Sequence, residues 1–429
     1  MQLKTRFRST VIRHFSSEKY LAGLRKKARK RREKQGIPPT VYYFHQVDDP
    51  YSHLAVQKLD ALKARYNVCF EVHLVSTPSA EFQGDASRFA TWAWRDALSI
   101  AEDFQTHFKP AVPAPAPHSV TVANQILAQN LEHADFAQLA LETGNLLWSG
   151  ETPAIDNNPA EGEGAVARGN QLRSQLGHYQ GAMFYFDGEW FWGVDRIRSL
   201  EQRLASEGFD SQPGPLCVPE PTPDPLNGKT VSGIELEYFP SLRSPYTAIG
   251  HQRVLDMIAN TGVKVNLRPV MPMMMRGIPA PRPKQQYIIT DSAREGREYG
   301  VPFGKVVDPF GEPVKRAFAL FPAAQEMGAG MAYITAYLQA AWFDGIDITK
   351  EAGLAQVVEN AGLDWLALRR HSSSADWQVI LERNLAVLNE NSLWGVPSFR
   401  VTGGNTEEAW ACWGQDRIWR VASEIARRA

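Results

Sequence analysis

Two segments far apart in the chain have nearly the same sequence, Trp192-Gly193-Val194-Asp195-Arg196-Ile197 and Trp413-Gly414-Gln415-Asp416-Arg417-Ile418. A pair of short apolar strand patterns precedes each segment, and an amphipathic helix pattern follows it. Upstream of each, a predicted strand runs into a Pro-Tyr turn, within residues 42–52 and 236–247. One architecture therefore occurs twice, and only the second copy has a hydroxyl, that of Ser244, directly before the proline of this turn.

The composition is that of an ordinary globular protein, with 429 residues, 44% hydrophobic, 22% charged and a formal net charge of −1. This length exceeds the size at which one core usually keeps growing, so we expect two domains. A charge near zero gives no attraction of the whole molecule to nucleic acid, which is not an expected partner. No apolar window approaches bilayer length, so we expect no membrane span.

The three cysteines, Cys69, Cys217 and Cys412, form no close pair. This spacing argues against a disulfide framework, a zinc site and a Cys-x-x-Cys redox centre. We therefore expect a reducing compartment, a cytoplasmic location and no metal.

The first 36 residues are dense in Lys and Arg, and their only acidic residues are Glu18 and Glu33. A solvated helix or a mobile arm explains this basic extension, and contact with RNA, anionic lipid or an acidic partner is the alternative. It lacks the apolar core of a secretory signal. A mitochondrial transit peptide ranks below the cytoplasmic interpretation.

The second copy contains a strand at residues 234–239, a helix from Pro245 to about Thr261 and a strand at 263–269. This order predicts a right-handed parallel βαβ unit. The pattern is helical from residue 284 to 391, and two strands around 399–401 and 410–412 precede a closing helix at 416–427. The first copy follows the same order, with strands at 40–45, 69–75, 184–186 and 190–192 and a helix from Pro50.

These patterns predict an α/β protein of two tandem thioredoxin-like domains, each with an inserted helical subdomain. The Pro-rich run at residues 213–225 is the natural linker, because proline removes backbone donors and fixes φ. The expected division is a basic extension at 1–36, a degenerate domain at 37–210, a linker at 211–231 and a second domain at 232–429.

Ser244 lies at the predicted N-terminus of a helix, where unpaired N–H groups favour negative charge. Its hydroxyl can donate to a thiolate and lower the pKa of that thiol, or it can simply cap the helix. Pro397 lies directly before a strand, and Gly395 with the opposing Ser244-Pro245 favours a cis Val396–Pro397 bond over a trans one. Asp416, like Asp195, can receive a ligand ammonium group or cap its helix.

Several segments resemble the DsbA-like thioredoxin superfamily, and within it most closely 2-hydroxychromene-2-carboxylate isomerases and kappa-class glutathione transferases. They are residues 244–246, 284–287, 300–303, 343–348, 395–399 and 413–417. The resemblance covers the whole second copy in order. Over the first copy it rests on residues 50–52, 94–96 and 192–196.

The resemblance implies a glutathione site, in which Ser244 bonds the sulfur and Val396 before Pro397 bonds the cysteinyl part. Lys284 matches a lysine near the glycyl carboxylate, and Gln415 with Asp416 matches the pair that holds the γ-glutamyl end. Where the family has Gly-Asn, this chain has Gly277-Ile278, so one polar contact is missing.

The family's disulfide oxidoreductases carry cysteines at the positions of Ser244 and Thr247, so we expect no dithiol chemistry. In the first copy, Asp49 occupies the corner and Met183 is predicted to replace the cis-proline. A carboxylate repels a thiolate, so this copy is expected to have lost glutathione.

The expected function is a glutathione-dependent isomerase or transferase for a small conjugated or aromatic electrophile, with the two domains paired as an internal pseudo-dimer. The run Met271-Pro272-Met273-Met274-Met275 either lines an apolar pocket or packs on the core. One alternative is a catalytically silent scaffold. Another is a mixed-disulfide reductase, which needs an exposed Cys412, whereas its predicted strand favours burial.

Overall fold

A computed structural model describes residues 3–154, 160–372 and 376–429. Packing divides the chain into two compact units. The C-terminal unit comprises Met1–Tyr20, Thr222–Ala280 and Ile288–Ala429, and the N-terminal unit comprises Leu21–Pro221 and Pro281–Tyr287. The basic extension expected at residues 1–36 is therefore shared between the two units.

The sheet of the N-terminal unit contains β1 (Thr40–His45), β2 (Cys69–Leu74), β3 (Met183–Phe186) and β4 (Glu189–Trp192) in the order β2-β1-β3-β4. Strand β1 pairs parallel with β2 and antiparallel with β3, and β3 pairs antiparallel with β4. Each of the four strands predicted for this copy is present, with ends within one residue of the expectation.

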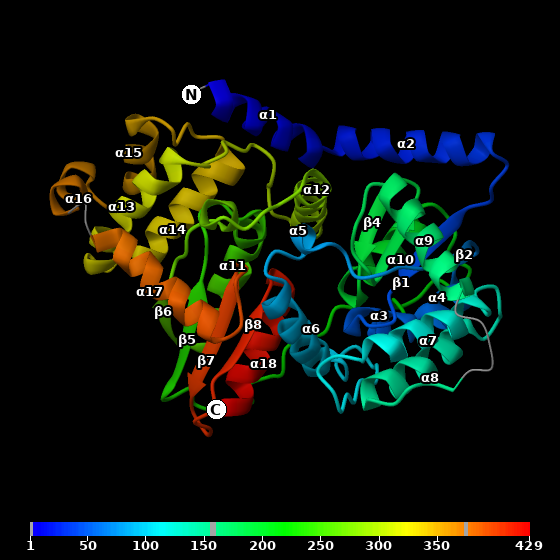
Figure 1. The fold of residues 1–429 in the computed structure, drawn as a ribbon. Helices are drawn as coiled ribbons and strands as arrows, with labels where there is room; N and C mark the ends of the chain where they lie inside the picture. Colours follow the sequence, from blue (N-terminus) through cyan, green and yellow to red (C-terminus); the bar gives the residue numbers. More distant parts are fainter. Residues whose placement is uncertain (1–2, 155–159, 373–375) are drawn as a thin grey trace. The chain divides into compact units, whose positions relative to one another are not determined.

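The sheet of the C-terminal unit contains β5 (Ile234–Phe239), β6 (Lys264–Leu267), β7 (Ser398–Gly403) and β8 (Trp410–Trp413) in the order β6-β5-β7-β8. Its pairing directions repeat those of the first sheet, including the parallel pair β5–β6. The predicted parallel βαβ unit is confirmed. The described residues form an α/β protein with two four-stranded sheets, most of whose strands are labelled in Figure 1.

Helix α11 (Pro245–Thr261) follows from local sequence. Proline is well placed in a first turn because its fixed φ suits a helix and its missing N–H is not needed there. Gly262 ends the helix with φ 67°, a left-handed conformation that glycine adopts without a side-chain clash. Helix α18 (Ile418–Arg428), red in Figure 1, packs against α11 and β7.

The N-terminal unit contains most of α2 (Glu18–Lys34) and the helices of the first copy. These are α3 (Pro50–Val56), α4 (Leu59–Arg65), α5 (Ala80–Gln83), α6 (Ala86–Ile100), α7 (Pro117–Ala128), α8 (Phe136–Ser149), α9 (Ala160–Gln175) and α10 (Ile197–Ser206). The helix predicted from Pro50 is thus interrupted at residues 57–58.

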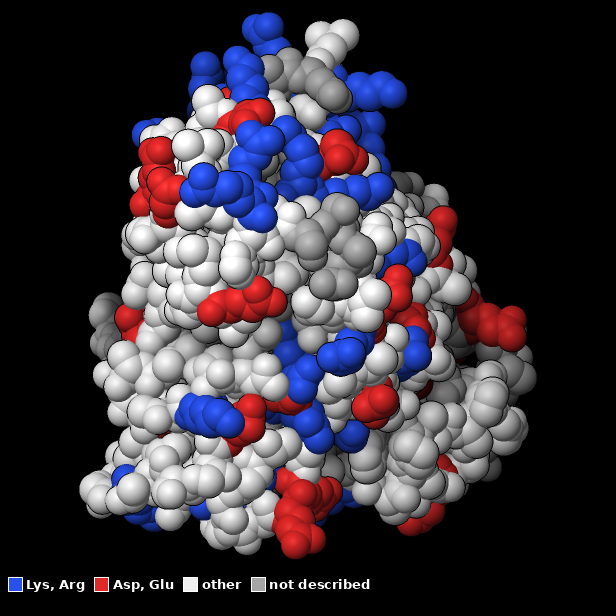
Figure 2. All heavy atoms as spheres, turned by 90° about the vertical axis from the view of Figure 1, so that its left-hand side faces the viewer, with Lys and Arg blue, Asp and Glu red and all other residues white. Residues whose placement is uncertain are grey.

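The C-terminal unit begins with α1 (Leu3–Ser16), so the first half of the basic extension is a docked helix. Figure 2 shows Lys and Arg side chains gathered at the top of its view, at the height of α1 in Figure 1. No helix in the described ranges is both long enough and apolar enough to cross a bilayer.

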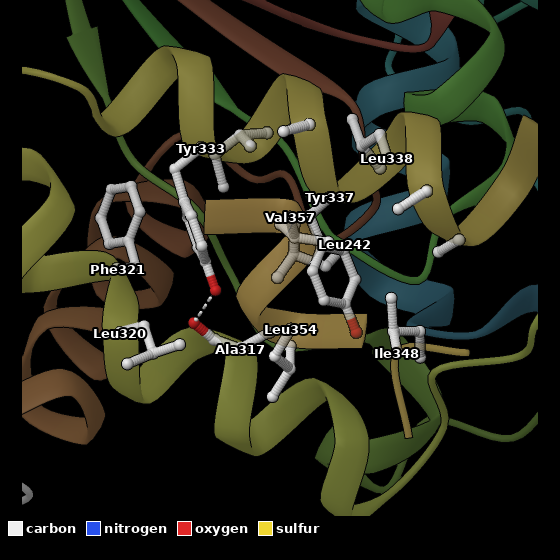
Figure 3. Close-up of a cluster of buried hydrophobic side chains, with 14 of the residues drawn as sticks. Leu242, Ala317, Leu320, Phe321, Tyr333, Tyr337, Leu338, Ile348, Leu354 and Val357 are labelled. Atoms are coloured by element: carbon white, nitrogen blue, oxygen red, sulfur yellow. Dashed lines mark hydrogen bonds between the residues drawn. The ribbon is translucent and has the colours of Figure 1, made fainter. Parts of the chain in front are cut away.

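The predicted helical insertion of the second copy is confirmed. It includes α13 (Glu312–Glu326), α14 (Gly330–Gln339), α15 (Glu351–Asn360), α16 (Trp365–His371) and α17 (Asp376–Glu390), while α12 (Arg282–Glu298) starts in the N-terminal unit. Figure 3 shows its core, where Tyr333 and Tyr337 of α14 lie among aliphatic side chains of α13 and α15. The Tyr333 hydroxyl donates to the carbonyl of Ala317 at 2.8 Å, which satisfies a polar group inside this core.

Strand register corrects one prediction about the first copy. Met183 pairs with Trp192, and Ser398 pairs with the matching Trp413, so Met183 corresponds to Ser398. The residue at the position of Pro397 is therefore Ala182, which has φ 53°. The backbone bonds agree, because Gly193 N donates to Ala182 O at 2.8 Å and Gly414 N donates to Pro397 O at 2.9 Å. The prediction that Met183 replaces the proline was wrong by one residue.

Candidate functional site

Ser244 caps α11 with an extended backbone, φ −104° and ψ 118°. Its Oγ accepts the Thr247 N–H at 3.1 Å and donates to the Val396 carbonyl at 3.2 Å. The residue is 8% exposed. The side chain therefore caps the helix and at the same time contacts the loop before β7, so capping alone does not describe it.

The Val396–Pro397 peptide is cis, as the sequence predicted. The loop that carries it is tightly packed: a Cβ on Gly395 would lie 2.2 Å from Cε2 of Trp413, so only glycine fits. The carbonyl of the preceding Trp394 accepts a bond from Arg276 Nη2 at 2.5 Å. These contacts fix the Val396 carbonyl opposite the Ser244 hydroxyl.

The methionine run leads into a short 3₁₀ helix, Met273–Arg276, which Arg276 joins to the loop at Trp394. Met271 and Met275 are partly buried against the helical core shown in Figure 3. Met274 Sδ lies 3.6 Å from Arg243 Nη1. Two members of the run thus pack on the core, which is the simpler of the two expectations, and pocket lining stays a prediction.

Gln415 is 1% exposed, and its side-chain amide forms hydrogen bonds with other protein side chains. Its Nε2 donates to Glu295 Oε2 at 3.1 Å and to Asp416 Oδ1, and its Oε1 accepts from Arg253. Gly414 and Gly193 are the caps of the short helices that contain Asp416 and Asp195, so neither aspartate acts as the cap. Gln415 therefore orients the Asp416 carboxylate rather than presenting its own amide.

Lys284 belongs to the N-terminal unit, where its Nζ donates to the Phe82 carbonyl at 2.7 Å. Burial lowers the pKa of this ammonium group to about 8. Ser244, Val396, Pro397, Gln415 and Asp416 all belong to the C-terminal unit. A role for Lys284 with a carboxylate stays a prediction.

Asp49 repeats the backbone of Ser244, with φ −105° and ψ 119°, at the start of α3. Its carboxylate accepts from Tyr51 N at 3.3 Å, Ser52 N at 3.0 Å and Ser52 Oγ at 2.9 Å. Burial raises the pKa of Asp49 to about 7, although these hydrogen bonds oppose the rise. The first copy therefore has an acidic group where the second has a neutral hydroxyl.

The tyrosine that follows each proline makes the same contact in both copies. Tyr51 Oη donates to Asp96 at 2.7 Å, and Tyr246 Oη donates to Asp291 at 2.8 Å. The two corners are thus built alike, and the difference between Asp49 and Ser244 is chemical rather than architectural.

Sequence reasoning missed a charged cluster next to Ser244. Asp308 is fully buried, and its two oxygens accept from Arg8 Nε at 2.6 Å and Arg243 Nε at 2.7 Å. Both guanidinium groups also lie over the Phe310 ring, at 5.1 Å and 4.7 Å from its centroid. The arginine directly before Ser244 was the available signal, but its partners are distant in sequence.

Cys412 is buried in β8, as predicted, so it presents no exposed thiol for a mixed disulfide. Within residues 3–154, 160–372 and 376–429, no group of three or more His, Cys, Asp or Glu side chains is placed to hold a metal ion.

Residues 235–426 match the family model of the DSBA-like thioredoxin domain. This match covers the second copy and agrees with its resemblance to the DsbA-like thioredoxin superfamily. No curated protein matches the chain.

Among solved structures, a 2-hydroxychromene-2-carboxylate isomerase is 22% identical over 45% of this chain and 95% of its own, with a TM-score of 0.37. The cytosolic disulfide reductase DsbM from Pseudomonas aeruginosa, solved with GSH, is 17% identical over 46% of this chain and 100% of its own, with a TM-score of 0.34. The oxidoreductase DsbA from Xylella fastidiosa is 13% identical over 48% and 90%, with a TM-score of 0.28. At these scores the likenesses carry no argument about function.

Proposed function

We propose that the C-terminal unit is a glutathione-dependent isomerase or transferase that acts on a small conjugated or aromatic electrophile. The observation that supports this most is the juxtaposition of the Ser244 hydroxyl, the N-terminus of α11 and the Val396 carbonyl. We further propose that the N-terminal unit is a degenerate thioredoxin-like copy, with domains at 37–210 and 232–429 joined by residues 211–231.

The residues of this corner fit the cysteinyl part of glutathione. Ser244 already has a donor hydroxyl at the positive end of a helix, where a thiolate is stabilised and its pKa falls. The Val396 carbonyl, which accepts a hydrogen bond from the Ser244 hydroxyl in this structure, can instead accept one from a ligand N–H. That exchange frees the hydroxyl to donate to sulfur. When bound, glutathione supplies the sulfur nucleophile for addition to the electrophile.

Asp416 is the proposed partner of the γ-glutamyl ammonium group, and Gln415 holds its carboxylate in place. Lys284 is the proposed partner of the glycyl carboxylate. Gly277-Ile278 supplies no amide side chain at the loop position where the family has asparagine, so we expect weaker glutathione binding than that pattern gives.

Glutathione titration by calorimetry, combined with ultraviolet absorbance of the bound thiolate, tests the proposal. The wild type should bind glutathione and show thiolate absorbance at neutral pH. Ser244→Ala should lose the thiolate signal. Asp364→Ala is the matched control, because Asp364 caps α16 through Ala367 N and lies outside the proposed site.

Absence of glutathione binding by the folded wild type would contradict the enzyme proposal and favour the silent scaffold. An unchanged thiolate signal in Ser244→Ala would remove the proposed role of the hydroxyl. An equal loss of the thiolate signal in Ser244→Ala and Asp364→Ala would show that the loss comes from helix capping and not from a contact with the sulfur.

A further inference from the structure

Helix α1 docks through a mainly polar face, with Ile12 packed against the helical core. Its buried residues are small and polar, with Thr5, Ser9 and Ser16 no more than 5% exposed. Its largest apolar side chains at the other face are solvent-exposed, Leu3 by 82% and Phe7 by 70%. A helix of a globular protein normally buries its apolar face, so an outward apolar face needs its own explanation.

Polar bonds to the C-terminal unit fix the orientation of α1. Ser9 Oγ accepts the Asp308 N–H at 3.0 Å, and Arg8 Nε donates to Asp308 Oδ2 at 2.6 Å. Arg13 Nε donates to the Val306 carbonyl at 2.8 Å. Because Arg8, Ser9 and Arg13 fix which face of the helix is docked, Leu3 and Phe7 are presented outward.

The outward face has the composition of an interfacial helix. Leu3 and Phe7 are four residues apart and therefore share one face, which Thr10 and His14 continue. Lys4, Arg6 and Arg13 flank this stripe, and the segment Leu3–Ser16 contains no Asp or Glu.

We propose that α1 binds the surface of an anionic lipid bilayer. Leu3 and Phe7 enter the boundary between headgroups and acyl chains, while Lys4 and Arg6 contact lipid phosphates and carboxylates. This proposal does not rest on glutathione binding.

A nucleic acid is the competing partner, because it also attracts cations. The outward lysines of α2, Lys26, Lys27, Lys30 and Lys34, share a face with no large apolar side chain and suit a phosphate backbone equally well. The exposed side chains of Leu3 and Phe7 on α1 favour the bilayer, because an aliphatic side chain such as Leu3 forms no favourable contact with a phosphate backbone.

Sedimentation of the full chain with vesicles tests the proposal. The wild type should bind vesicles of phosphatidylcholine with phosphatidylserine and bind pure phosphatidylcholine vesicles weakly. The double variant Leu3→Asp/Phe7→Asp should lower affinity for the anionic vesicles at least about tenfold. Lys4→Glu/Arg6→Glu should also weaken binding and reduce its salt dependence.

Leu366→Asp is the matched control, because Leu366 is 61% exposed on a different helix. It should bind anionic vesicles as the wild type does, and circular dichroism should show the same helix content for all variants. No sedimentation of the wild type with anionic vesicles would overturn the proposal. So would binding that survives Leu3→Asp/Phe7→Asp, or binding of RNA but not of vesicles.

Discussion

At the residue scale, Ser244 and Asp49 are a matched pair. Their backbone angles agree within a degree, both cap a helix that starts with Pro-Tyr, and both corners contain a tyrosine bonded to an aspartate. The two corners therefore differ in one functional group. Comparing them separates what a cap needs, which is any acceptor oxygen, from what a thiolate needs, which is a neutral donor.

Ser244→Asp should keep the helix cap and abolish thiolate binding. Aspartate caps as well as serine, but burial of its carboxylate, as at Asp49, should lower the free energy of unfolding at neutral pH. The added carboxylate repels a thiolate, so glutathione affinity at neutral pH should fall at least about tenfold. Calorimetry and urea unfolding measure the two quantities. Ser244→Asn, a neutral cap, is the control and should bind glutathione better than Ser244→Asp.

Asp49→Asn should change how stability depends on pH. The folded pKa of Asp49, about 7, lies above its ordinary value of 3.8, so its stabilising contribution is complete below pH 3.8 and is lost as pH rises through 7. The free energy of unfolding of Asp49→Asn relative to wild type should therefore increase as pH rises from 3.8 to 7. The increase is at most about 4 kcal/mol, for a shift of about three pKa units.

The measurement is urea unfolding at several pH values, taken as the difference between the two proteins. Burial lowers the pKa of His45 to about 3 and of His53 to about 4, so these groups destabilise the fold as pH falls below 6.5. Their effect is common to both proteins and cancels in the difference. A difference that is flat with pH would show that Asp49 ionises normally.

At the element scale, the loop 394–397 depends on a glycine that the sequence singled out for another reason. Gly395 was expected to favour a cis bond, and the structure gives it a further role, because the Trp413 ring occupies the space of a side chain. The Trp413 ring also packs against Trp394, with ring centroids 4.7 Å apart and ring planes tilted by 54°. Loop and strand β8 are thus joined through aromatic packing.

Gly395→Ala should therefore displace Trp413 and lower stability by about 1–3 kcal/mol, the usual cost of overpacking. It should also weaken glutathione binding, because Val396 is the next residue. Gly23→Ala in α2 is the contrasting control, since no atom lies within 4 Å of its added Cβ and alanine favours a helix. Equal effects of the two substitutions in urea unfolding would contradict this account.

The elements themselves were largely predictable from sequence. Short apolar or alternating patterns located the strands, and Pro245 marked the start of α11, because these signals are local. The break between α3 and α4 and the position of Ala182 were not predicted. Helix continuity and strand register are decided by partners elsewhere in the chain, and Ala182 carries no motif of its own.

At the scale of the whole molecule, the Pro-rich segment is bonded to the N-terminal unit at several points, and Glu201 is one of them. Glu201 is fully buried, and its carboxylate accepts from Cys217 N at 2.8 Å, Val218 N at 2.9 Å and Tyr66 Oη at 3.0 Å. A Pro-rich segment with the composition of a flexible linker is therefore held in place by the buried Glu201 carboxylate.

Glu201→Ala should free this part of the linker and expose Cys217. Burial, followed by the Glu201 charge, raises the pKa of the Cys217 thiol, so the substitution also favours the thiolate. Thiol labelling of Cys217, followed by mass spectrometry, should become faster, because greater exposure and a lower thiol pKa both increase the reactive thiolate.

Two other cysteines serve as internal references for this labelling. Cys69 is exposed and should label quickly in both proteins, whereas Cys412 is buried and should label slowly in both. Glu201→Gln keeps one acceptor oxygen and should label at an intermediate rate. Faster labelling of Cys412 in Glu201→Ala would indicate general unfolding instead of linker release.

The candidate site was predicted in part. Ser244, Val396 and Pro397 come together as expected, because a helix start and a strand start carry recognisable sequence signals. The internal bonding of Gln415 and the sharing of Asp308 by two arginines were not foreseen. Both depend on side chains that are distant in sequence, and no local pattern specifies which charges will be buried together.

The shared Asp308 has a practical consequence for anyone who shortens this protein. Deleting the first helix removes Arg8 and leaves a buried carboxylate with only Arg243 to neutralise it. Arg243 is the immediate neighbour of Ser244, so the backbone at the proposed catalytic serine would readjust. A chain without α1 is thus expected to differ from the full chain in thiol chemistry. Protein prepared for activity assays should therefore keep this basic helix.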